Sequence, residues 1–396
     1  MRFPHRTIFL LGLVTIVVYG AWFYAFGVLL DPILTDTGWP ESAVAATFSL
    51  SAALGASMAV PAGRLVDRYG ARVSFAAAAT ISMSGLWFAS GADDVLSFAV
   101  GAVLGGASLQ ALAFYHVTQA TAARVAPQEP TRAIALLTIY GAFSSTIFVP
   151  LTAYLVTDVG WRTTVRILVT TSAAVLVVGS VFVGGRASTA RVVTPPDFRQ
   201  AFAEPAARRF VIGSALAGFG VGVMLVYQVP LMTGAGLSVG VAAWMAGARG
   251  AAQITGRIPL SYIVGRLGAR GSVRLAFAMI AVAVVLLALA GNVAVALAYV
   301  AVAGFGIGAT SPLQGIYANE LFDKAHLGAS IGVITMVFGL SNAAGPVIVG
   351  LLADLTGTRW WGVALAVGAG LSAVAVIGRT ETAVNQTLQP GDVPHR

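Results

Sequence analysis

Residues 63–72 of this sequence read GRLVDRYGAR, a charged stretch between two long apolar runs, Ser42–Ala62 and Val73–Gly91. Four of these ten residues carry a charge, although only 10% of the whole chain is charged. Each flanking run has about 20 residues, enough for one α-helix to cross roughly 30 Å of hydrocarbon. The pattern predicts a short charged loop between two membrane-spanning helices.

A related stretch occurs in the second half of the chain, where residues 261–270 read SYIVGRLGAR. Glycine and alanine matches alone would arise by chance in this composition, but two prolines and two arginines in register are harder to obtain that way. A parallel repeat relates the two halves by an axis along the membrane normal and places a site between them near mid-membrane. The matches at an offset of 198 residues are Pro32 and Pro230, Gly38 and Gly236, Pro61 and Pro259, Arg68 and Arg266, Gly70 and Gly268, Arg72 and Arg270, and Gly141 and Gly339.

Apolar runs recur along all 396 residues, of which 58% are hydrophobic, and the mean hydropathy is +0.86. A soluble domain needs more charge than this to cover its surface. We therefore predict an all-α membrane protein with twelve transmembrane helices in two pseudo-symmetric six-helix bundles. The predicted spans are Ile8–Leu30, Ser42–Ala62, Val73–Gly91, Val95–Ala122, Ala133–Val156, Thr163–Gly184, Phe210–Gly234, Val241–Ile263, Val273–Ala290, Val293–Leu321, Leu327–Leu352 and Trp361–Gly378.

The longest connection between spans divides the chain into two halves. It contains two adjacent prolines and five arginines. The predicted organisation is an N-terminal six-helix bundle (1–185), a cytoplasmic linker (186–209), a C-terminal six-helix bundle (210–380) and a cytoplasmic tail (381–396).

The charges of the loops indicate the orientation in the membrane. The side that carries both termini has 18 Lys and Arg residues, and the other side has only Arg162, Arg166 and Arg359. Positive residues concentrate on the cytoplasmic side of membrane proteins. We expect a multi-pass protein of the bacterial plasma (inner) membrane, with both termini in the cytoplasm. The net charge of +8 then faces anionic lipid, and a nucleic-acid partner is not needed.

Other classes of protein lack support in the sequence. The absence of cysteine excludes disulfides, thiolate metal sites and cysteine nucleophiles. No nucleophile, base and orienting acid occur together, and no cluster with metal-ligand spacing is present. We expect a monomer that is not an enzyme and holds neither a metal nor a cofactor.

The stretch at 63–72 resembles the signature G-x-L-x-D-R-x-G-x-R of the major facilitator superfamily. The resemblance implies a conformational role, in which the aspartate caps or pairs across helix ends and the arginines hold the outward-open state. The alternative is that the arginines only anchor the loop. The C-terminal copy has Gly265 in place of the acid, so a weaker gate is expected there. The implied gating residues are Gly63, Arg64, Asp67, Arg68, Gly70, Arg72, Arg266 and Arg270.

Further segments look like the branch of oxalate:formate antiporters and monocarboxylate transporters. They are the sequence GWR at 160–162, the sequence GLLAD at 350–354 and a Gly-Arg pair at 256–257. In that branch the arginine of the last segment binds the substrate carboxylate, which implies this role for Arg257. The chain departs from the pattern at Tyr19 and Gln253, which stand where acids are found, and it has no lysine in its eleventh span.

Two formal charges lie well inside the predicted spans, Arg249 and Arg257, with Gln253 between them. Residues four apart share one face of a helix, and a charge within hydrocarbon costs several kcal/mol (roughly 3 on the insertion scale). A guanidinium group binds a carboxylate through two parallel hydrogen bonds and stays charged. The pair therefore indicates an anion site, with snorkelling of Arg257 to the membrane surface as the alternative.

Polar and aromatic residues in the neighbouring spans are further candidates for lining the site. His116 suits proton relay because its pKa range lies near neutrality, although a packing role is the commoner one. The other candidates are Tyr19, Trp22, Tyr24, Gln110, Tyr115, Tyr140, Tyr227, Gln228, Gln314, Tyr317 and Asn342.

The sequence thus predicts a secondary transporter with alternating access for a small organic anion, foremost a monocarboxylate, with a proton as an optional coupled ion. One alternative is a proton-driven efflux transporter for drugs or other small molecules, which usually needs an acid within the membrane. Another is a membrane sensor or scaffold without transport.

Overall fold

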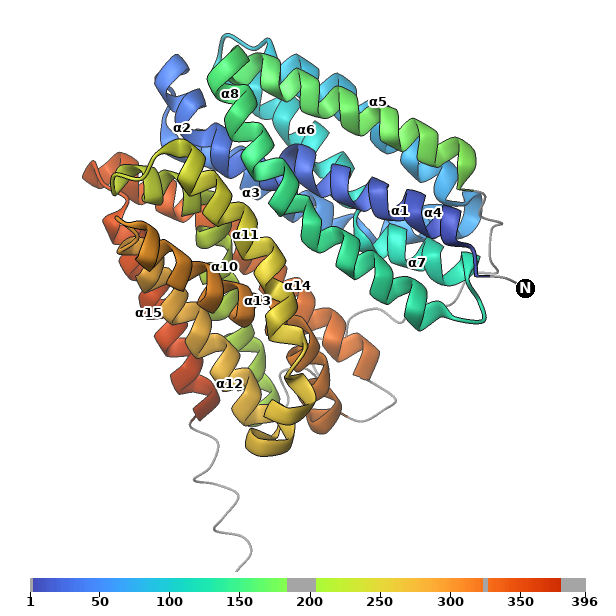
Figure 1. Ribbon diagram of the computed structural model, residues 1–396, viewed down its shortest axis with the longest axis vertical. Helices are drawn as coiled ribbons and strands as arrows, with labels where there is room; N and C mark the ends of the chain where they lie inside the picture. The colour runs from blue at the N-terminus through green and yellow to red at the C-terminus, as the bar shows by residue number, and fades with distance from the viewer. Residues whose placement is uncertain (1–2, 184–203, 323–326, 379–396) are drawn as a thin grey trace, which may run out of the picture.

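The computed structural model describes residues 3–183, 204–322 and 327–378, and for residues 59, 60, 67, 328 and 329 it describes the backbone alone. Every regular element within these ranges is a helix (Figure 1). Nine of the helices are long and apolar enough to cross a membrane. An α-helix satisfies its own backbone hydrogen bonds, which a lipid-exposed segment requires.

The N-terminal half contains nine elements, which form the first six spans. Span 1 combines three of them because a π-helical segment, η1, interrupts it. The elements are α1 (His5–Val18), η1 (Tyr19–Tyr24), α2 (Phe26–Thr37), α3 (Glu41–Ser57), α4 (Ala59–Tyr69), α5 (Ala71–Ser90), α6 (Val95–Ala113), α7 (Tyr115–Val125) and the long α8 (Pro130–Phe182).

The C-terminal half forms the other six spans from six helices. They are α10 (Pro205–Gly234), α11 (Val239–Arg257), α12 (Leu260–Ala288), α13 (Val293–Leu321), α14 (Leu327–Thr356) and α15 (Trp360–Gly378). The predicted linker at 186–209 lies largely outside the described residues, but α10 already begins at Pro205, ahead of the predicted Phe210.

The predicted twelve-span fold is confirmed, although helices and spans do not correspond one to one. The 53 residues of α8 contain two spans, which turn at Gly160 with φ 73° and ψ 166°. The helix α12 turns in the same way at Gly268, with φ 68° and ψ 170°. Span 2 is divided into two helices near Pro61, and span 8 is divided near Pro259. A proline has no N–H group and cannot donate a backbone hydrogen bond to the preceding turn. Helix α3 ends at Ser57, four residues before Pro61, and α11 ends two residues before Pro259.

The internal repeat is visible in the backbone. Gly38 and Gly236 both have positive φ, of 66° and 104°, and Gly70 and Gly268 both do, of 80° and 68°. Each pair is related by the offset of 198 residues found in the sequence. The repeat therefore preserves the positions at which the chain turns at the ends of spans.

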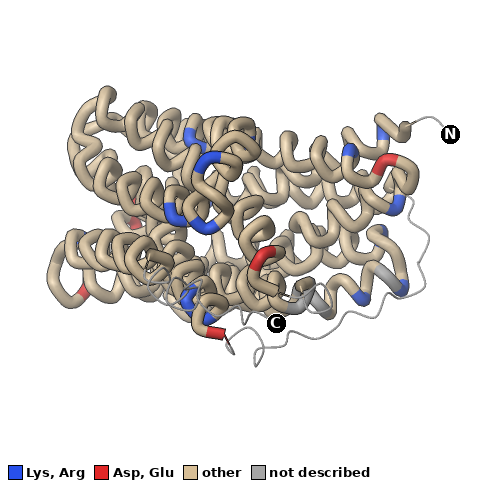
Figure 2. The backbone as a smooth tube through the Cα atoms, turned by 90° about the horizontal axis from the view of Figure 1, so that it is seen from below, with Lys and Arg blue, Asp and Glu red and all other residues tan. Residues whose placement is uncertain are grey.

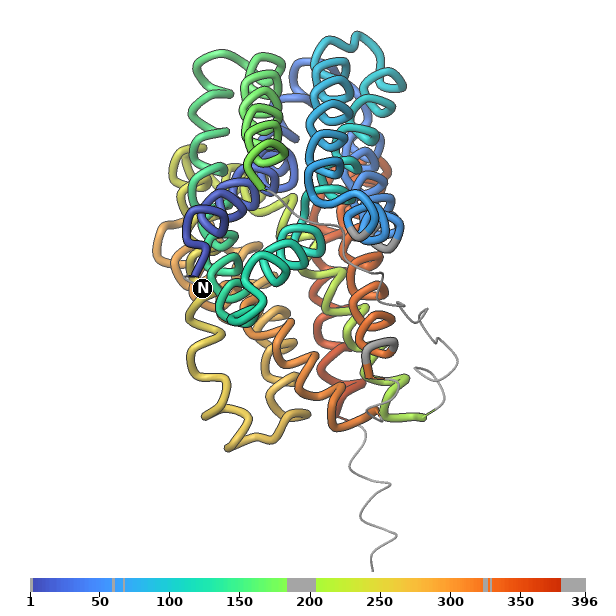
Figure 3. The backbone as a smooth tube through the Cα atoms, turned by 90° about the vertical axis from the view of Figure 1, so that its right-hand side faces the viewer, coloured from blue at the N-terminus to red at the C-terminus, as the bar shows by residue number. Residues whose placement is uncertain are grey.

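The two halves lie against each other at one end and diverge toward the other (Figure 1). We call the end at which α1 begins and α15 ends the terminal end, and the opposite one the far end. Contacts between halves join α3 to α14, α8 to α11 and α2 to α10. Figure 3 shows the halves from the side, with the N-terminal half above.

Small residues permit the close approach of the halves toward the far end. A Cβ on Gly27 of α2 would lie 2.7 Å from the carbonyl oxygen of Val226 of α10, and one on Gly247 of α11 would lie 3.2 Å from Pro150 of α8. Glycine at helix crossings allows such backbone contact in membrane proteins. The arrangement closes the far end and leaves the terminal ends of the halves apart.

Basic residues gather at the terminal end, as the charge pattern predicts. In Figure 2 Lys and Arg follow the right-hand end near the N-terminus and the front of the C-terminal half. The arginines of the 63–72 stretch and Arg266 are exposed there. The far end carries acidic residues, among them Asp31, Asp36 and Glu41.

We expect Gly268→Ala to destabilise the protein, because φ 68° with ψ 170° is a region essentially limited to glycine and costs other residues about 1–3 kcal/mol. The control is Gly265→Ala in the same helix, since an added Cβ meets nothing within 4 Å at either position. Thermal unfolding of the purified protein in detergent measures the difference. Equal midpoints for the two variants would contradict the prediction.

Candidate functional site

Arg249 of α11 is the deepest charged side chain of the described chain, with 2% of its surface exposed. Its Nε donates a hydrogen bond of 2.9 Å to Oε1 of Gln228 in α10, and the hydroxyl of Tyr299 in α13 donates to the same oxygen at 3.0 Å. Its buried Nη2 has no hydrogen-bond partner. The positive charge is thus held by a neutral amide, and within the described residues it has no carboxylate partner.

Arg257 is the last residue of α11 and is half-buried. Its Nε donates a hydrogen bond of 3.4 Å to the carbonyl oxygen of Gly308 in α13. Eight residues separate it from Arg249, which amounts to about 12 Å along the helix. The side chain therefore reaches across to α13 at the point at which span 8 is divided.

Tyrosines of the N-terminal half lie within the electrostatic reach of both arginines. The charges of Arg249 and Arg257 act on the hydroxyl of Tyr24, and that of Arg257 also acts on the hydroxyl of Tyr115. Tyr24 and Tyr115 in turn interact with Tyr19. Residues of spans 1 and 4 therefore lie within the range of the charges of span 8.

Both spans that supply these tyrosines depart from α-helical geometry at the site. Tyr19–Tyr24 form the π-helical segment η1, and Phe114 between α6 and α7 is extended, with φ −76° and ψ −175°. The rings of Tyr19 and Phe114 stack with their centroids 3.8 Å apart. Such interruptions of helices occur frequently at functional sites.

His116 lies beside this break, but its described contact is structural. Its Nε2 donates a hydrogen bond of 2.6 Å to the carbonyl oxygen of Ala111, a group that the break at Phe114 has released from the helix. The imidazole therefore closes the gap between α6 and α7.

Several predicted site residues of the N-terminal half lie away from the arginines. Trp22 is 1% exposed and packs against Phe26 and Gly106. Gln110 donates a hydrogen bond of 3.2 Å to Ser51 within its own half. Tyr140 packs against α1, where an added Cβ on Gly12 would overlap its ring.

In the C-terminal half, too, some of the predicted residues lie at the arginines and others lie elsewhere. Gln228 lies at the site because it accepts a hydrogen bond from Arg249. Tyr317 is 6% exposed and packs edge-on against Phe210, and the amide nitrogen of Gln314 is buried without a partner. Gln253 and Asn342 are half-buried. The backbone carbonyl group of Gln253 lies against Gly308, and that of Asn342 lies against Gly222.

A second polar cluster joins the two halves at the far end, and we call it the latch: Asp31, Glu41, Asp354 and Arg359. Nε of Arg359 donates to both carboxylate oxygens of Glu41 at 2.8 and 3.1 Å, and its Nη2 donates to Oδ1 of Asp31 at 2.6 Å. Asp354 accepts from the backbone N–H groups of Glu41 and Ser42 at 2.9 Å each.

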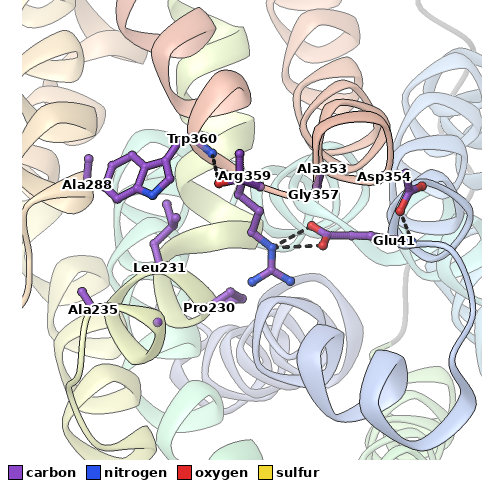
Figure 4. Close-up of a pocket in the computed structure, with 12 residues that line it drawn as sticks. Glu41, Pro230, Leu231, Ala235, Ala288, Ala353, Asp354, Gly357, Arg359 and Trp360 are labelled. Carbon is purple, nitrogen blue, oxygen red and sulfur yellow. Dashed lines mark hydrogen bonds and ion pairs between the residues drawn. The ribbon is translucent and has the colours of Figure 1, made fainter.

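The latch residues are partly shielded from solvent. The side chain of Arg359 is 21% exposed and that of Glu41 is 12% exposed. Burial by itself lowers the pKa of Arg359, but hydrogen bonds and charges from Glu41 and Asp31 more than offset this and raise it above its usual value. Figure 4 shows Arg359 directed toward Glu41 beside a pocket of about 430 Å³ that Pro230, Leu231 and Trp360 also line.

Tyr227 lies at the latch and not at the arginine pair of α11. It is fully buried, its ring packs under the guanidinium of Arg359 at 5.5 Å, and its hydroxyl donates to the carbonyl oxygen of Pro346 at 3.1 Å. Because Tyr227 and Gln228 are neighbours in α10, one helix connects the latch with Arg249.

The predicted gating residues lie at the terminal end. Arg270 donates to the carbonyl oxygens of Ile377 and Gly378 at the end of α15, at 2.8–3.1 Å. Arg68 and Arg266 lie over the rings of Tyr69 and Tyr262, and Arg64 and Arg72 are exposed. A Cβ added to Gly63 would meet nothing within 4 Å. The side chain of Asp67 lies outside the described residues. The gating role stays a prediction.

Comparison with known proteins identifies the family. The Major Facilitator Superfamily model matches residues 11–227 and 210–392, and the chain belongs to this superfamily of membrane transporters. It is accordingly a multi-pass transporter and not an enzyme. No curated protein sequence matches the chain.

Solved structures show the same fold at low sequence identity. The nucleoside transporter NupG has a TM-score of 0.79 at 13% identity, with 94% of this chain and 98% of that chain covered. A D-xylose-proton symporter has a TM-score of 0.70 at 15% identity, with 96% and 98% covered. A bacterial homologue of the lysosomal transporter Spinster, in an inward-facing conformation, has a TM-score of 0.72 at 14% identity, with 96% and 95% covered.

Sequence reasoning missed several residues of both clusters. Tyr299 and Phe114 carry no signal that separates them from other apolar span residues. Arg359 did carry a signal, because it is one of three arginines on the side that is otherwise acidic. Its partners, 318 and 328 residues away, cannot be recognised without the tertiary structure.

We expect Arg359→Ala to favour separation of the halves at the far end. Hydrogen bonds between charged partners contribute about 1.5–3 kcal/mol each, so their loss shifts the population of the closed state by roughly 10-fold or more. The chain has no cysteine, so Val229→Cys, 5% exposed between α10 and α2, can serve as a single reporter of thiol labelling.

The labelling rate of that cysteine should rise several-fold in the Arg359→Ala background. The matched control is Arg132→Ala, which removes an ion pair of 2.8 Å with Glu129 inside one half. An unchanged rate in the first variant, or an equal rise in the control, would show that the latch does not hold the far end closed.

Proposed function

We propose that this transporter carries a small organic anion with a carboxylate group by alternating access, acting as a monomer. The observation that carries the proposal is Arg249, whose buried Nη2 has no partner and whose charge is matched by no described carboxylate. A charge so placed costs free energy unless a counter-ion joins it. An anionic substrate supplies that counter-ion.

The facing tyrosines give the substrate a second set of contacts. Hydroxyl groups of Tyr24 and Tyr115 can donate to an oxyanion held near the guanidinium groups of Arg249 and Arg257. Because the tyrosines belong to one half and the arginines to the other, an anion bound to both groups draws the halves together. Binding that depends on the conformational state is what alternating access requires.

The orientation in the membrane follows from the charges. We place the terminal end in the cytoplasm because basic residues concentrate there, and the latch then faces the outside. With the far end closed and the terminal ends apart, the conformation corresponds to an inward-facing state. The resemblance of the Gly256–Arg257 segment to the oxalate:formate and monocarboxylate branch supports the same class of substrate.

The test is uptake of labelled lactate and oxalate by proteoliposomes, with D-xylose and uridine as neutral comparators. We expect acids to be transported, and Arg249→Gln and Arg257→Gln each to lower uptake. Loss of a charge-assisted pair worth about 1.5–3 kcal/mol corresponds to roughly 10-fold to 100-fold in affinity.

Arg132→Ala is the control, because its guanidinium pairs at the surface with Glu129. Size-exclusion profiles should be the same for all variants, so that lost uptake is not lost folding. Transport of xylose or uridine in place of the acids, or acid uptake that survives both arginine substitutions, would overturn the proposal.

Proton coupling is a separate part of the proposal. Within the described residues His116 is the titratable imidazole nearest to the tyrosines, and with Nε2 bound to Ala111 its other ring nitrogen is the one that can exchange a proton. We expect an inward proton gradient to accelerate uptake, and His116→Gln, which can keep a hydrogen bond to Ala111, to abolish the acceleration. Uptake by the variant that still responds to the proton gradient would show that His116 takes no part in the coupling. Uptake by the wild type that does not respond to the gradient would show that transport is not coupled to protons.

A further inference from the structure

Five aromatic residues line the N-terminal side of the candidate site, and we call them the aromatic wall: Tyr19, Phe23, Tyr24, Phe114 and Tyr115. Their rings contact one another in a continuous set. Tyr19 stacks on Phe114 at 3.8 Å and lies 5.0 Å from Tyr115, and Phe23 lies 5.3 Å from Tyr24 and 5.7 Å from Phe114.

The residues of the wall are not completely covered. All five residues are only half-buried. The aromatic residues behind them are covered completely, with Trp22 at 1% and Phe26 and Phe48 at 0% exposure. Ordinary packing therefore accounts for the second set, whereas the wall retains ring surface that a ligand can cover.

The backbone presents the wall in a way that packing alone does not require. Tyr19, Phe23 and Tyr24 belong to the π-helical segment, and Phe114 is the extended residue that divides span 4. A π-helical turn and a break each weaken a span by disturbing its hydrogen bonds. Both disturbances occur at residues of the wall, two of which, Tyr24 and Tyr115, lie within the range of the charges of Arg249 and Arg257.

The wall and the arginines select opposite ends of one ligand. The face of an aromatic ring is negative and its edge is positive, so the ring faces of the wall favour an apolar, planar group, whereas the hydroxyl groups of its tyrosines remain donors for the carboxylate. The guanidinium groups attract the carboxylate. A ligand that satisfies both sides has a carboxylate at one end and a flat ring at the other.

We propose that the transported anion is an arylcarboxylate, with its carboxylate at Arg249 and Arg257 and its ring against the wall. This inference rests on the proposed function and narrows its substrate class. Stacking on the wall adds a contact with the N-terminal half to the hydrogen bonds from its tyrosine hydroxyls, so a ligand with both a ring and a carboxylate joins the halves more strongly. Short acids without a ring lack the stacking contact.

The experiment compares three acids as substrates of the full-length protein in proteoliposomes: benzoate, cyclohexanecarboxylate and acetate. Benzoate and cyclohexanecarboxylate have similar size and charge, and they differ in the planarity and π-electrons of the ring. We expect benzoate to have the lowest KM, at least about 10-fold below that of acetate, and cyclohexanecarboxylate to lie between them.

Variants then locate the ring site. Phe114→Leu should raise the KM for benzoate several-fold more than that for acetate, and Phe114→Tyr, which keeps the aromatic ring, should restore the benzoate value. The control is Tyr154→Leu on α8, whose side chain is 67% exposed and remote from the wall. The comparison of acids in the wild type does not depend on how the variants fold.

The outcomes separate this inference from the function on which it rests. Equal KM values for the three acids, with uptake still dependent on Arg257, would overturn the arylcarboxylate assignment and leave anion transport standing. A preference for benzoate that Phe114→Leu does not alter would overturn the assignment of the ring site to the wall. Transport of none of the acids would overturn both.

Discussion

The guanidinium group of Arg249 brings a full positive charge to a position that solvent hardly reaches, where Gln228 is its hydrogen-bond partner and one of its nitrogens has none. A charge within a membrane-spanning segment is costly, and such charges mark substrate or ion pathways. The features around Arg249 fit a role of this kind. Tyr24 of the other half lies within the range of its charge, the span that carries Tyr24 is interrupted there, and a neutral amide fixes the orientation of the guanidinium without cancelling its charge.

The same constraint links the site to the far end of the molecule. Gln228, which orients Arg249, follows Tyr227 in α10, and the ring of Tyr227 lies under Arg359 of the latch. A displacement of α10 therefore affects both clusters at once. This gives the central site and the latch a shared mechanical element, since packed helices shift as units and not continuously.

The two prolines of the repeat mark places at which spans are divided. Pro61 and Pro259 each stand where a span is divided, near the terminal end of spans 2 and 8. Proline accounts for those divisions through its missing N–H group. The division of span 4 at Phe114 has no such local cause, and its ring instead stacks on Tyr19 from another span. Contact between spans sustains it.

The sequence by itself determined the twelve-span fold and the two-fold repeat, and it singled out Arg249 and Arg257 as candidates, because apolar length, register and the cost of a buried charge are properties of short segments. It did not determine which of the candidate polar residues meet these arginines. Gln228 does, through a hydrogen bond, and Tyr24 and Tyr115 lie within the range of their charges, whereas Tyr140, Tyr227 and Tyr317 lie elsewhere. The pairing of Arg359 with Asp31 and Glu41 was likewise decided only by the tertiary structure, since hydrogen bonds and ring contacts depend on distances between residues that are hundreds of positions apart in the chain.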